Sequence, residues 1–377
     1  MKTQKHSVVL AAAVLTLLGA CAKKEEAAPA AAAPVAEEKV VNVYNWSDYI
    51  GENTIANFEK ETGIKVRYDN YDSNETLEAK LLTGSSGYDV VVPSAPFLEK
   101  QIKAGVYRKL DKAQLTNMGN MDPDIAQRLQ LHDPNNDHAV NYMWGTTGVG
   151  YNAAKIKKLM PNAPVDSWRM VFDPAVVKNF KSCGVTVLDS PSEMNDMVLA
   201  YLGKDPNSQN PDDLKLVEET LLKIRPYIKY IHSSQYIADL ASGEICIAVG
   251  YNGDILQARS RAEENKTGVD VQYSIPKEGT IIWFDSMAIP ADAPHPNNAH
   301  TFINYMMRPE VIAEVSGATN YANGNLAATP MVVEGVRTDP GVYPSAEVKA
   351  KLFPNLSDTD EFTRLQTRVW TKFSTGQ

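Results

Sequence analysis

The first part of the chain alternates short β-branched runs with segments of helical spacing. Strand patterns occur at residues 40–44, 64–68 and 88–92. Helical patterns follow them, around residue 58 and at residues 76–82 and 96–104. Asn53 is the predicted N-cap of the first helix, and Gly63 is its predicted stop. This order of elements predicts a parallel sheet whose faces are covered by helices.

A second unit of the same kind follows. It has predicted strands at residues 185–188 and 244–250, and predicted helices at residues 194–202, 214–224 and 236–242. A strand ending at residues 287–290 and a helix at residues 297–307 are expected to rejoin the first unit. Residues 144–151 and 275–283 combine strand formers with glycine, as expected of segments that cross between lobes and must bend. The pattern therefore predicts an α/β protein of two lobes, joined by two crossing strands, with a cleft between them.

Chain length supports this division, because a body of ~340 residues exceeds the size at which one core stops growing. We expect the following parts: a signal peptide at 1–20, a lipidated tether or linker at 21–38, the first part of lobe 1 at 39–147, lobe 2 at 148–281, the second part of lobe 1 at 282–350, and at 351–377 a C-terminal helical segment that packs across the lobes.

The N-terminus has the pattern of an export signal. Lys2 and Lys5 precede an apolar run at residues 8–18 that is too short to span a bilayer. The following Leu-Gly-Ala-Cys resembles a bacterial lipobox, which predicts lipidation of Cys21; the alternative is a plain signal peptide cut near Ala22. Residues 22–38 are rich in Ala, Pro, Glu and Lys without an aromatic residue, a composition that favours a tether over a folded segment.

Cysteine content and charge fit an exported protein. Besides Cys21 the chain has Cys183 and Cys246, which we expect to form a disulfide in an oxidising compartment, with two buried free thiols as the alternative. The formal net charge of −9 argues against nucleic acid as a partner and raises the local concentration of cations. Solubility alone would also explain this acidity.

Aromatic residues stand beside carboxylates at several predicted strand ends. The acids are Asp48, Glu193, Asp254 and Asp285, and none has arginine or lysine adjacent in sequence. Each has a structural explanation when taken alone, such as a favourable charge at a helix N-terminus. Together, carboxylates bind ammonium groups through charge-assisted hydrogen bonds, while ring faces attract cations and pack methylenes. The pattern therefore predicts a pocket for an alkyl chain that carries ammonium groups.

Motifs of common enzymes are missing from the sequence. It contains no His-Glu-x-x-His, no Gly-x-Ser-x-Gly and no glycine-rich phosphate loop. His132 and His138 flank an Asp-Pro-Asn-Asn-Asp loop, which a solvated surface turn explains better than a metal site. The candidate pocket has no arginine to bind the carboxylate of an amino acid. We expect neither an enzyme nor a bound metal or cofactor.

Four stretches of sequence carry a family resemblance, at residues 43–50, 88–94, 144–148 and 274–279. With Tyr-Ala-Asn at residues 321–323, they resemble the periplasmic polyamine-binding proteins of bacterial ABC importers, the putrescine-binding branch above all. The resemblance implies a type II periplasmic solute-binding fold. It also implies a ligand-binding set made of Trp46, Ser47, Asp48, Tyr49, Ser94, Glu193, Tyr251, Asp254, Trp283, Asp285 and Tyr321.

The function implied by the resemblance is capture of a linear polyamine between the lobes and delivery to an inner-membrane ABC permease. Putrescine is the first expectation, while spermidine, cadaverine and agmatine stay open. Glu193 and Asp254 are expected to hold one ammonium, and Asp48 and Asp285 the other. We expect a monomer in the periplasm, anchored through a lipid on Cys21. The alternative is a polyamine sensor that serves a signalling partner.

Overall fold

A computed structural model describes residues 37–71 and 73–376 of the 377-residue chain. The predicted signal peptide, Cys21 and most of the predicted tether lie outside the described residues. Within those two ranges, no helix combines the length and the apolar character that crossing a bilayer requires. The described chain is a mixed α/β structure, as the alternating pattern predicts.

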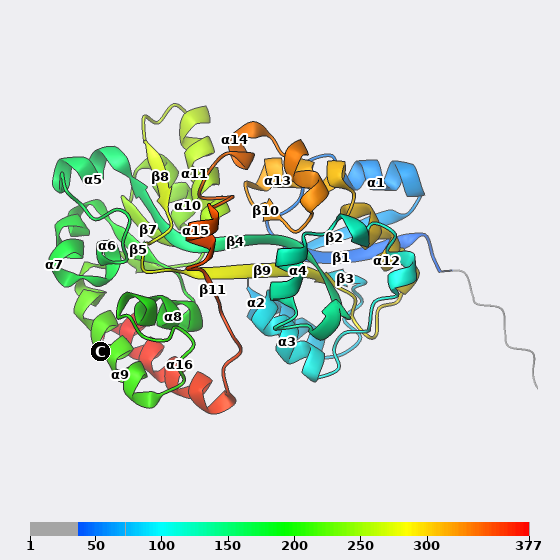
Figure 1. Ribbon diagram of the computed structural model, residues 1–377, viewed down its shortest axis with the longest axis horizontal. Helices are drawn as coiled ribbons and strands as arrows, with labels where there is room; N and C mark the ends of the chain where they lie inside the picture. The colour runs from blue at the N-terminus through cyan, green and yellow to red at the C-terminus, as the bar shows by residue number, and fades with distance from the viewer. Residues whose placement is uncertain (1–36, 72, 377) are drawn as a thin grey trace, which may run out of the picture. The chain divides into compact units, whose positions relative to one another are not determined.

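Buried apolar residues form two separate clusters, and each cluster is the core of one lobe. The cluster of lobe 1 includes Val43, Phe58 and Phe302. The cluster of lobe 2 includes Val187 and Trp168. Two long strands, β4 (Ala139–Asn152) and β9 (Ile281–Ala288), run between the two groups of elements in Figure 1. The predicted architecture of two lobes joined by two crossing strands is thus confirmed, while the boundary residues given above stay predictions.

Lobe 1 is built on the parallel strands predicted from the first part of the chain. Strand β1 pairs in parallel with both β2 and β3. The strands of lobe 1 are β1 (Val40–Trp46), β2 (Lys65–Tyr71), β3 (Val90–Val91) and β10 (Ala322–Asn323). Its helices are α1 (Thr54–Thr62), α2 (Asn74–Leu82), α3 (Ala95–Lys103), α4 (Pro123–Leu129), α12 (Pro296–Met306), α13 (Pro309–Thr319), α14 (Glu334–Arg337) and α15 (Ala346–Lys349). Gly63 ends α1 in the left-handed conformation, as predicted, whereas the side chain of Asn53 makes no capping bond.

Lobe 2 repeats the arrangement, with β5 parallel to both β6 and β7. Its strands are β5 (Val185–Val187), β6 (Tyr230–Ile231), β7 (Ile247–Tyr251) and β8 (Val271–Ser274). Its helices are α5 (Ala153–Leu159), α6 (Arg169–Phe172), α7 (Pro174–Val177), α8 (Pro191–Tyr201), α9 (Pro211–Ile224), α10 (Tyr236–Ser242) and α11 (Asn252–Glu264). Helix α11 begins directly at the end of β7.

The last helix, α16 (Asp360–Thr375), belongs to the core of lobe 2. Its residues Phe362, Val369, Trp370 and Phe373 join the lobe 2 cluster, and the helix packs against α8 and α9. A short strand, β11 (Phe353–Pro354), pairs in parallel with β9 shortly before it. The chain thus passes from the crossing strands to lobe 2 through an extended segment (Figure 1).

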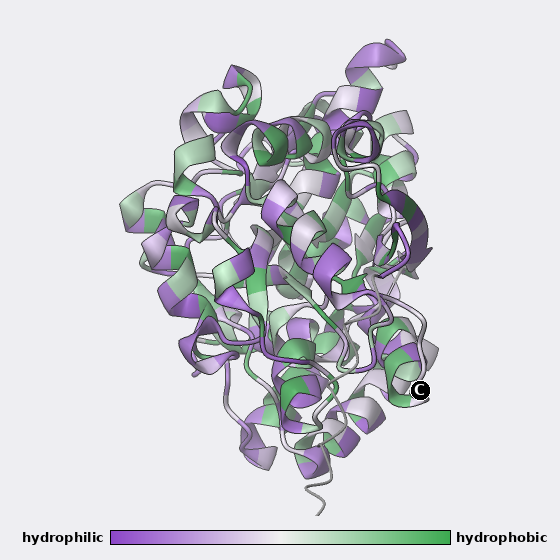
Figure 2. Cartoon of the chain, turned by 90° about the vertical axis from the view of Figure 1, so that its right-hand side faces the viewer, coloured by the Kyte–Doolittle hydropathy of each residue, from purple (hydrophilic) through white to green (hydrophobic). Residues whose placement is uncertain are grey.

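The crossing strands continue one sheet through both lobes. Among the described residues the strand order is β2-β1-β3-β9-β4-β7-β5-β6, and β4 and β9 are antiparallel. A glycine in β4 is required by packing: a Cβ on Gly145 would lie 2.3 Å from Asn252 Oδ1 and 2.4 Å from the Trp283 ring. In Figure 2 most helices alternate between hydrophobic and hydrophilic residues, as helices with one buried face do.

The predicted disulfide is present. Cys183 and Cys246 are bonded, with their Cα atoms 5.5 Å apart. The bond joins the residues just before β5 and β7, two neighbouring strands of lobe 2. It closes a loop with a sequence separation of 63 residues, so it restricts the unfolded chain considerably.

We predict that replacing both cysteines by serine lowers the free energy of unfolding by about 2–4 kcal/mol, because the open loop regains conformational entropy in the unfolded state. Urea denaturation followed by circular dichroism measures this loss. A matched control is the unaltered protein treated with a reductant, which should unfold at a similar urea concentration. An unchanged midpoint in both samples would contradict the prediction.

Candidate functional site

Two of the predicted site acids lie in the first turns of lobe 2 helices. Glu193 lies in α8, which follows β5, and Asp254 lies in α11, which follows β7. Because β5 and β7 are parallel neighbours, both helices begin at the same edge of the sheet. The sheet topology therefore brings these two acids to one face of lobe 2.

Glu193 is surrounded by hydroxyl groups. It accepts hydrogen bonds from Thr147 Oγ1 and Tyr251 OH at 2.9 Å each, and from Ser190 Oγ at 3.3 Å. Burial raises the pKa of the Glu193 carboxyl, against these hydrogen bonds, which favour the charged form. The carboxylate is held in place without an opposite charge.

Asp254 accepts hydrogen bonds from two tyrosines of different lobes. Tyr236 OH, in lobe 2, lies 2.7 Å from Oδ2, and Tyr321 OH, in lobe 1, lies 2.6 Å from Oδ1. Burial again raises the pKa of this carboxyl. The bond to Tyr321 joins the lobes directly beside the site.

Asp285 is the third acid and the most deeply buried of the three, and it comes from the lobe 1 side of the crossing strand β9. Tyr49 OH lies 2.9 Å from Oδ2, and Ser94 Oγ lies 2.6 Å from Oδ1. Burial raises the pKa of Asp285 to about 6. The sequence predicts that all four acids lie at strand ends. For Asp285 this prediction is wrong, because the residue lies within β9. It is close to the others because β9 crosses between the lobes.

Four aromatic rings connect the three acids. Tyr251, Trp283, Tyr321 and Tyr49 contact one another in this order, with ring centroids 5.9, 5.2 and 5.4 Å apart. Each pair packs edge to face, an arrangement that aromatic pairs prefer. Tyr251 binds Glu193, Tyr321 binds Asp254 and Tyr49 binds Asp285, which makes the rings and the acids one connected assembly.

The Trp-Ser-Asp segment at the end of β1 makes other contacts than the three acids. The Trp46 ring packs on Tyr71 with centroids 4.7 Å apart, and its Nε1 donates to Val92 O at 2.9 Å, close to Ser94. Ser47 and Asp48 are exposed. The Asp48 side chain is 79% exposed and lies 4.0 Å from Arg261, an interlobe ion pair that sequence neighbours do not reveal. Asp48 therefore lies at the rim, apart from Asp285.

Several residues that contact the acids or their partners were not predicted from the sequence. Thr147 belongs to the crossing stretch and Ser190 to the loop before α8, and both positions could have been included. Asn74 exchanges two hydrogen bonds with Ser94, each 3.0 Å long. It follows the end of β2, and site residues were expected at strand ends. Tyr236 opens helix α10 and has no signal in the sequence that links it to Asp254.

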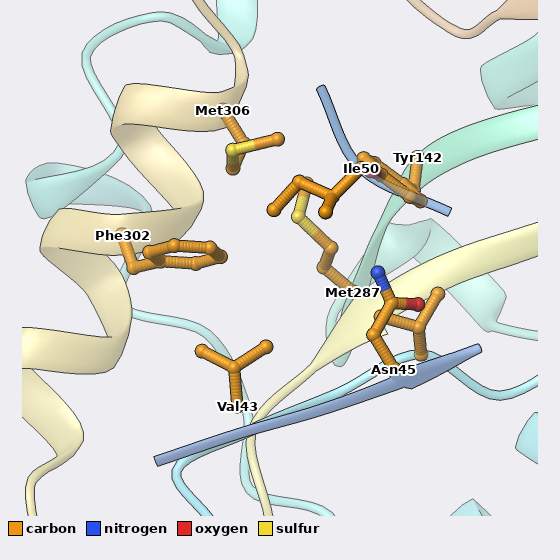
Figure 3. A pocket seen from close by; sticks show the side chains of 8 residues that line it. Val43, Asn45, Ile50, Tyr142, Met287, Phe302 and Met306 are labelled. Carbon is orange, nitrogen blue, oxygen red and sulfur yellow. The ribbon is translucent and has the colours of Figure 1, made fainter. Parts of the chain in front are cut away.

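A small cavity lies behind the Tyr49 loop in the core of lobe 1 (Figure 3). Its volume is about 10 Å³, and its lining is apolar except for Asn45 and the Tyr142 hydroxyl. Tyr142 donates to the backbone oxygen of Tyr49 at 2.6 Å, which fixes the loop that carries the Asp285 partner. A cation has no carboxylate to bind there, so the cavity is part of the core.

The arrangement is suited to a cation. Glu193, Asp254 and Asp285 form no ion pair with lysine, arginine or histidine in the described part of the chain, and their hydrogen-bond partners are neutral hydroxyls. An ammonium placed among them would supply the positive charge that the three acids lack. Across residues 37–71 and 73–376, no group of three or more metal-binding side chains is present. The loop at His132 and His138 is used structurally, since Asp133 accepts from the His138 ring and backbone.

The chain is similar to known solute-binding proteins. The family model for bacterial extracellular solute-binding proteins matches residues 53–343. The putrescine-binding periplasmic protein SpuD of Pseudomonas aeruginosa is 56% identical, over 91% of this chain and 94% of its own. The putrescine-binding periplasmic protein PotF of Escherichia coli is 53% identical, over 91% and 93%.

A solved structure extends the comparison to the fold. The spermidine/putrescine ABC transporter substrate-binding protein PotD of Streptococcus pneumoniae superimposes with a TM-score of 0.77 at 27% identity. The alignment covers 90% of this chain and 99% of that one. The type II periplasmic binding fold predicted from the sequence is thereby confirmed. The chain belongs to the bacterial extracellular solute-binding protein family, among its periplasmic polyamine-binding members.

Proposed function

We propose that this protein binds putrescine between its lobes and delivers it to an ABC importer. The single observation that supports this most is a set of three carboxylates, one buried and two half-buried, that both lobes contribute and that accept hydrogen bonds, within the described residues, only from neutral hydroxyls. SpuD and PotF carry putrescine binding in their names and are more than half identical to this chain, which supports the same ligand here. A relative in Pseudomonas aeruginosa named for putrescine and agmatine is 43% identical, so agmatine is the second candidate.

The proposed mechanism follows from the positions of the acids. Glu193 and Asp254 of lobe 2 hold one ammonium, and Asp285 holds the other with Tyr49 and Ser94 around it. Asp48 is exposed at the rim and lies near Arg261 of the other lobe. Its charge therefore favours closure of the lobes more than it contributes to direct binding of the ligand. Tyr251, Trp283 and Tyr321 pack the methylenes between the ammonium groups. Since the acids lie on two lobes, a dication stabilises the closed form preferentially.

Transport is the role we propose, with a sensor as the alternative. We infer a periplasmic location from the periplasmic relatives, and delivery to an inner-membrane permease from the transporter context of the PotD structure. The lipid on Cys21 and a monomeric state complete the proposal. Mass spectrometry of the N-terminal peptide of the exported protein tests the lipid, and recovery of unaltered amine after incubation tests the absence of catalysis.

Calorimetric titration tests the proposed function. The protein, freed of ligand by unfolding and refolding, should bind putrescine with a dissociation constant of about 1 μM or lower, near −8 kcal/mol. Agmatine, cadaverine and spermidine are titrated in parallel, and lysine, which carries a carboxylate, is the negative control. Absence of binding to all four amines would overturn the proposal.

Asp285→Asn is expected to weaken putrescine binding by about 2–5 kcal/mol, because one ammonium loses its charged partner in a buried site. Titration calorimetry at pH 7.5 measures the change. The matched control is Asp270→Asn, which removes the same charge from an exposed position of lobe 2. Equal affinities for the two variants would contradict the assignment of Asp285.

The affinity for putrescine should fall as the pH falls through about 6. In the free protein the pKa of Asp285 is raised to about 6, and the carboxyl must lose its proton to bind an ammonium. Affinity at pH 5 is therefore expected to be about tenfold lower than at pH 7, with protons released on binding. Titrations in two buffers of different ionisation enthalpy measure this release.

The variant Asp285→Asn is also the control for this pH dependence, because it has no group to titrate at that position. Its affinity should vary less between pH 5 and 7 than that of the unaltered protein, since only Glu193 and Asp254 still contribute. A steeper dependence in the variant, or tighter binding at pH 5 in the unaltered protein, would count against the assigned role of Asp285.

A further inference from the structure

Residues 354–359, called the strap here, connect β11 to helix α16 and bind lobe 2 along most of their length. Asn207 Nδ2 donates to Pro354 O at 3.1 Å, and Leu356 N donates to Asn207 Oδ1 at 3.0 Å. Thr359 Oγ1 lies 3.0 Å from Gln209 Oε1. Asn207 and Gln209 lie between α8 and α9, so these bonds fix the strap to lobe 2.

One residue of the strap turns to the other lobe. Ser357 Oγ lies 3.0 Å from Pro96 O and 3.0 Å from Glu99 Oε2, both in helix α3 of lobe 1. Glu99 is itself held by the buried His132, whose Nδ1 is 3.2 Å away, and by Lys103. The acceptors that Ser357 meets in lobe 1 are therefore fixed in position before the strap reaches them.

The strap touches both site helices next to their ligand-facing residues. On lobe 2, Asn355 Nδ2 donates to Asp196 Oδ2, and Asp196 is buried in α8 one turn after Glu193. On lobe 1, Pro96 is two residues after Ser94, which donates to Asp285. Asn355 and Ser357, two residues apart in the strap, thus contact the helix behind each acid group.

We propose that the strap sets the spacing between α3 and α8 in the closed protein, and that Ser357 is a positioning residue for the choice of ligand length. The inference rests on the proposed function. A diamine must place its two ammonium groups at Glu193 and at Asp285 together, so the spacing of the helices behind them decides which chain length fits. Ser357 acts on this spacing without touching the ligand.

The physical reason is that a cleft between two lobes has no fixed width of its own. Two crossing strands allow lobes to rotate relative to each other, and a ligand one methylene longer can be accommodated by a slightly wider closure. A third connection across the cleft, hydrogen-bonded to both site helices, resists that adjustment. Loss of this connection should therefore reduce discrimination between ligand lengths as well as the lifetime of the complex.

The experiment compares Ser357→Ala with the unaltered full-length protein, for putrescine and for cadaverine, which is one methylene longer. Dissociation rates are measured by stopped-flow fluorescence of the site aromatics, and dissociation constants by calorimetry. We expect putrescine to dissociate about fivefold faster from the variant, as for loss of one hydrogen bond. The ratio of the two dissociation constants should move about threefold or more toward unity.

Two control variants separate positioning from general damage. Ser374→Ala removes a hydroxyl that bonds only within α16, to Thr371 O at 3.1 Å, and should leave the ratio unchanged. Ser357→Thr keeps the hydroxyl and should restore the ratio. An equal loss of affinity for both diamines in Ser357→Ala, or no change in rate and ratio, would overturn the proposal.

A second readout keeps the strap testable independently of the ligand. If the unaltered protein binds neither diamine, the proposed function fails, and hydrogen–deuterium exchange of the ligand-free protein then decides on the strap. Faster exchange at the first turns of α3 and α8 in Ser357→Ala supports a positioning role. Unchanged exchange in both helices overturns it.

Discussion

The site depends on three carboxylates, one buried and two half-buried, that have no charged partner in the part of the chain that the structure describes. Placing an ionised group in a low-dielectric interior is costly unless hydrogen bonds or an opposite charge compensate. Here Tyr, Ser and Thr hydroxyls supply the hydrogen bonds, while the opposite charge is left to the ligand. In the free protein the pKa values of the three acids are raised, and a bound ammonium would lower them again. The free site is therefore ready to bind a cation.

The surrounding fold provides what such a site needs. Parallel strands bring Glu193 and Asp254 to one edge of lobe 2, and the crossing strand β9 carries Asp285 to the same place from the other side. Rings packed edge to face line the site between the acids and connect them to one another. Close packing of β4 on Trp283 and Asn252, possible at Gly145, holds the two crossings together.

Sequence reasoning was most reliable for the lobes and least reliable for side chains that act across them. The strand–helix order, the disulfide and the fold follow from local patterns and cysteine count. The location of Asp285 within β9, the exposure of Asp48 and its pairing with Arg261 do not, because these depend on how the lobes meet. Within one lobe, the bond from Tyr236 to Asp254 was not predicted either, because it joins two separate helices of lobe 2.

The sequence by itself determined the α/β class, the two lobes with two crossings and the chemical character of the ligand, because periodicity, glycine stops and acids beside rings are local properties. The family followed from the resemblance of whole stretches of sequence to known binding proteins. Only the tertiary structure decided which acids share a buried site and which partners hold them. It also placed the strap between α3 and α8, with Ser357 on Glu99. The reason is physical: burial and charge pairing are set by contacts between segments distant in sequence, and those contacts exist only once the lobes have packed.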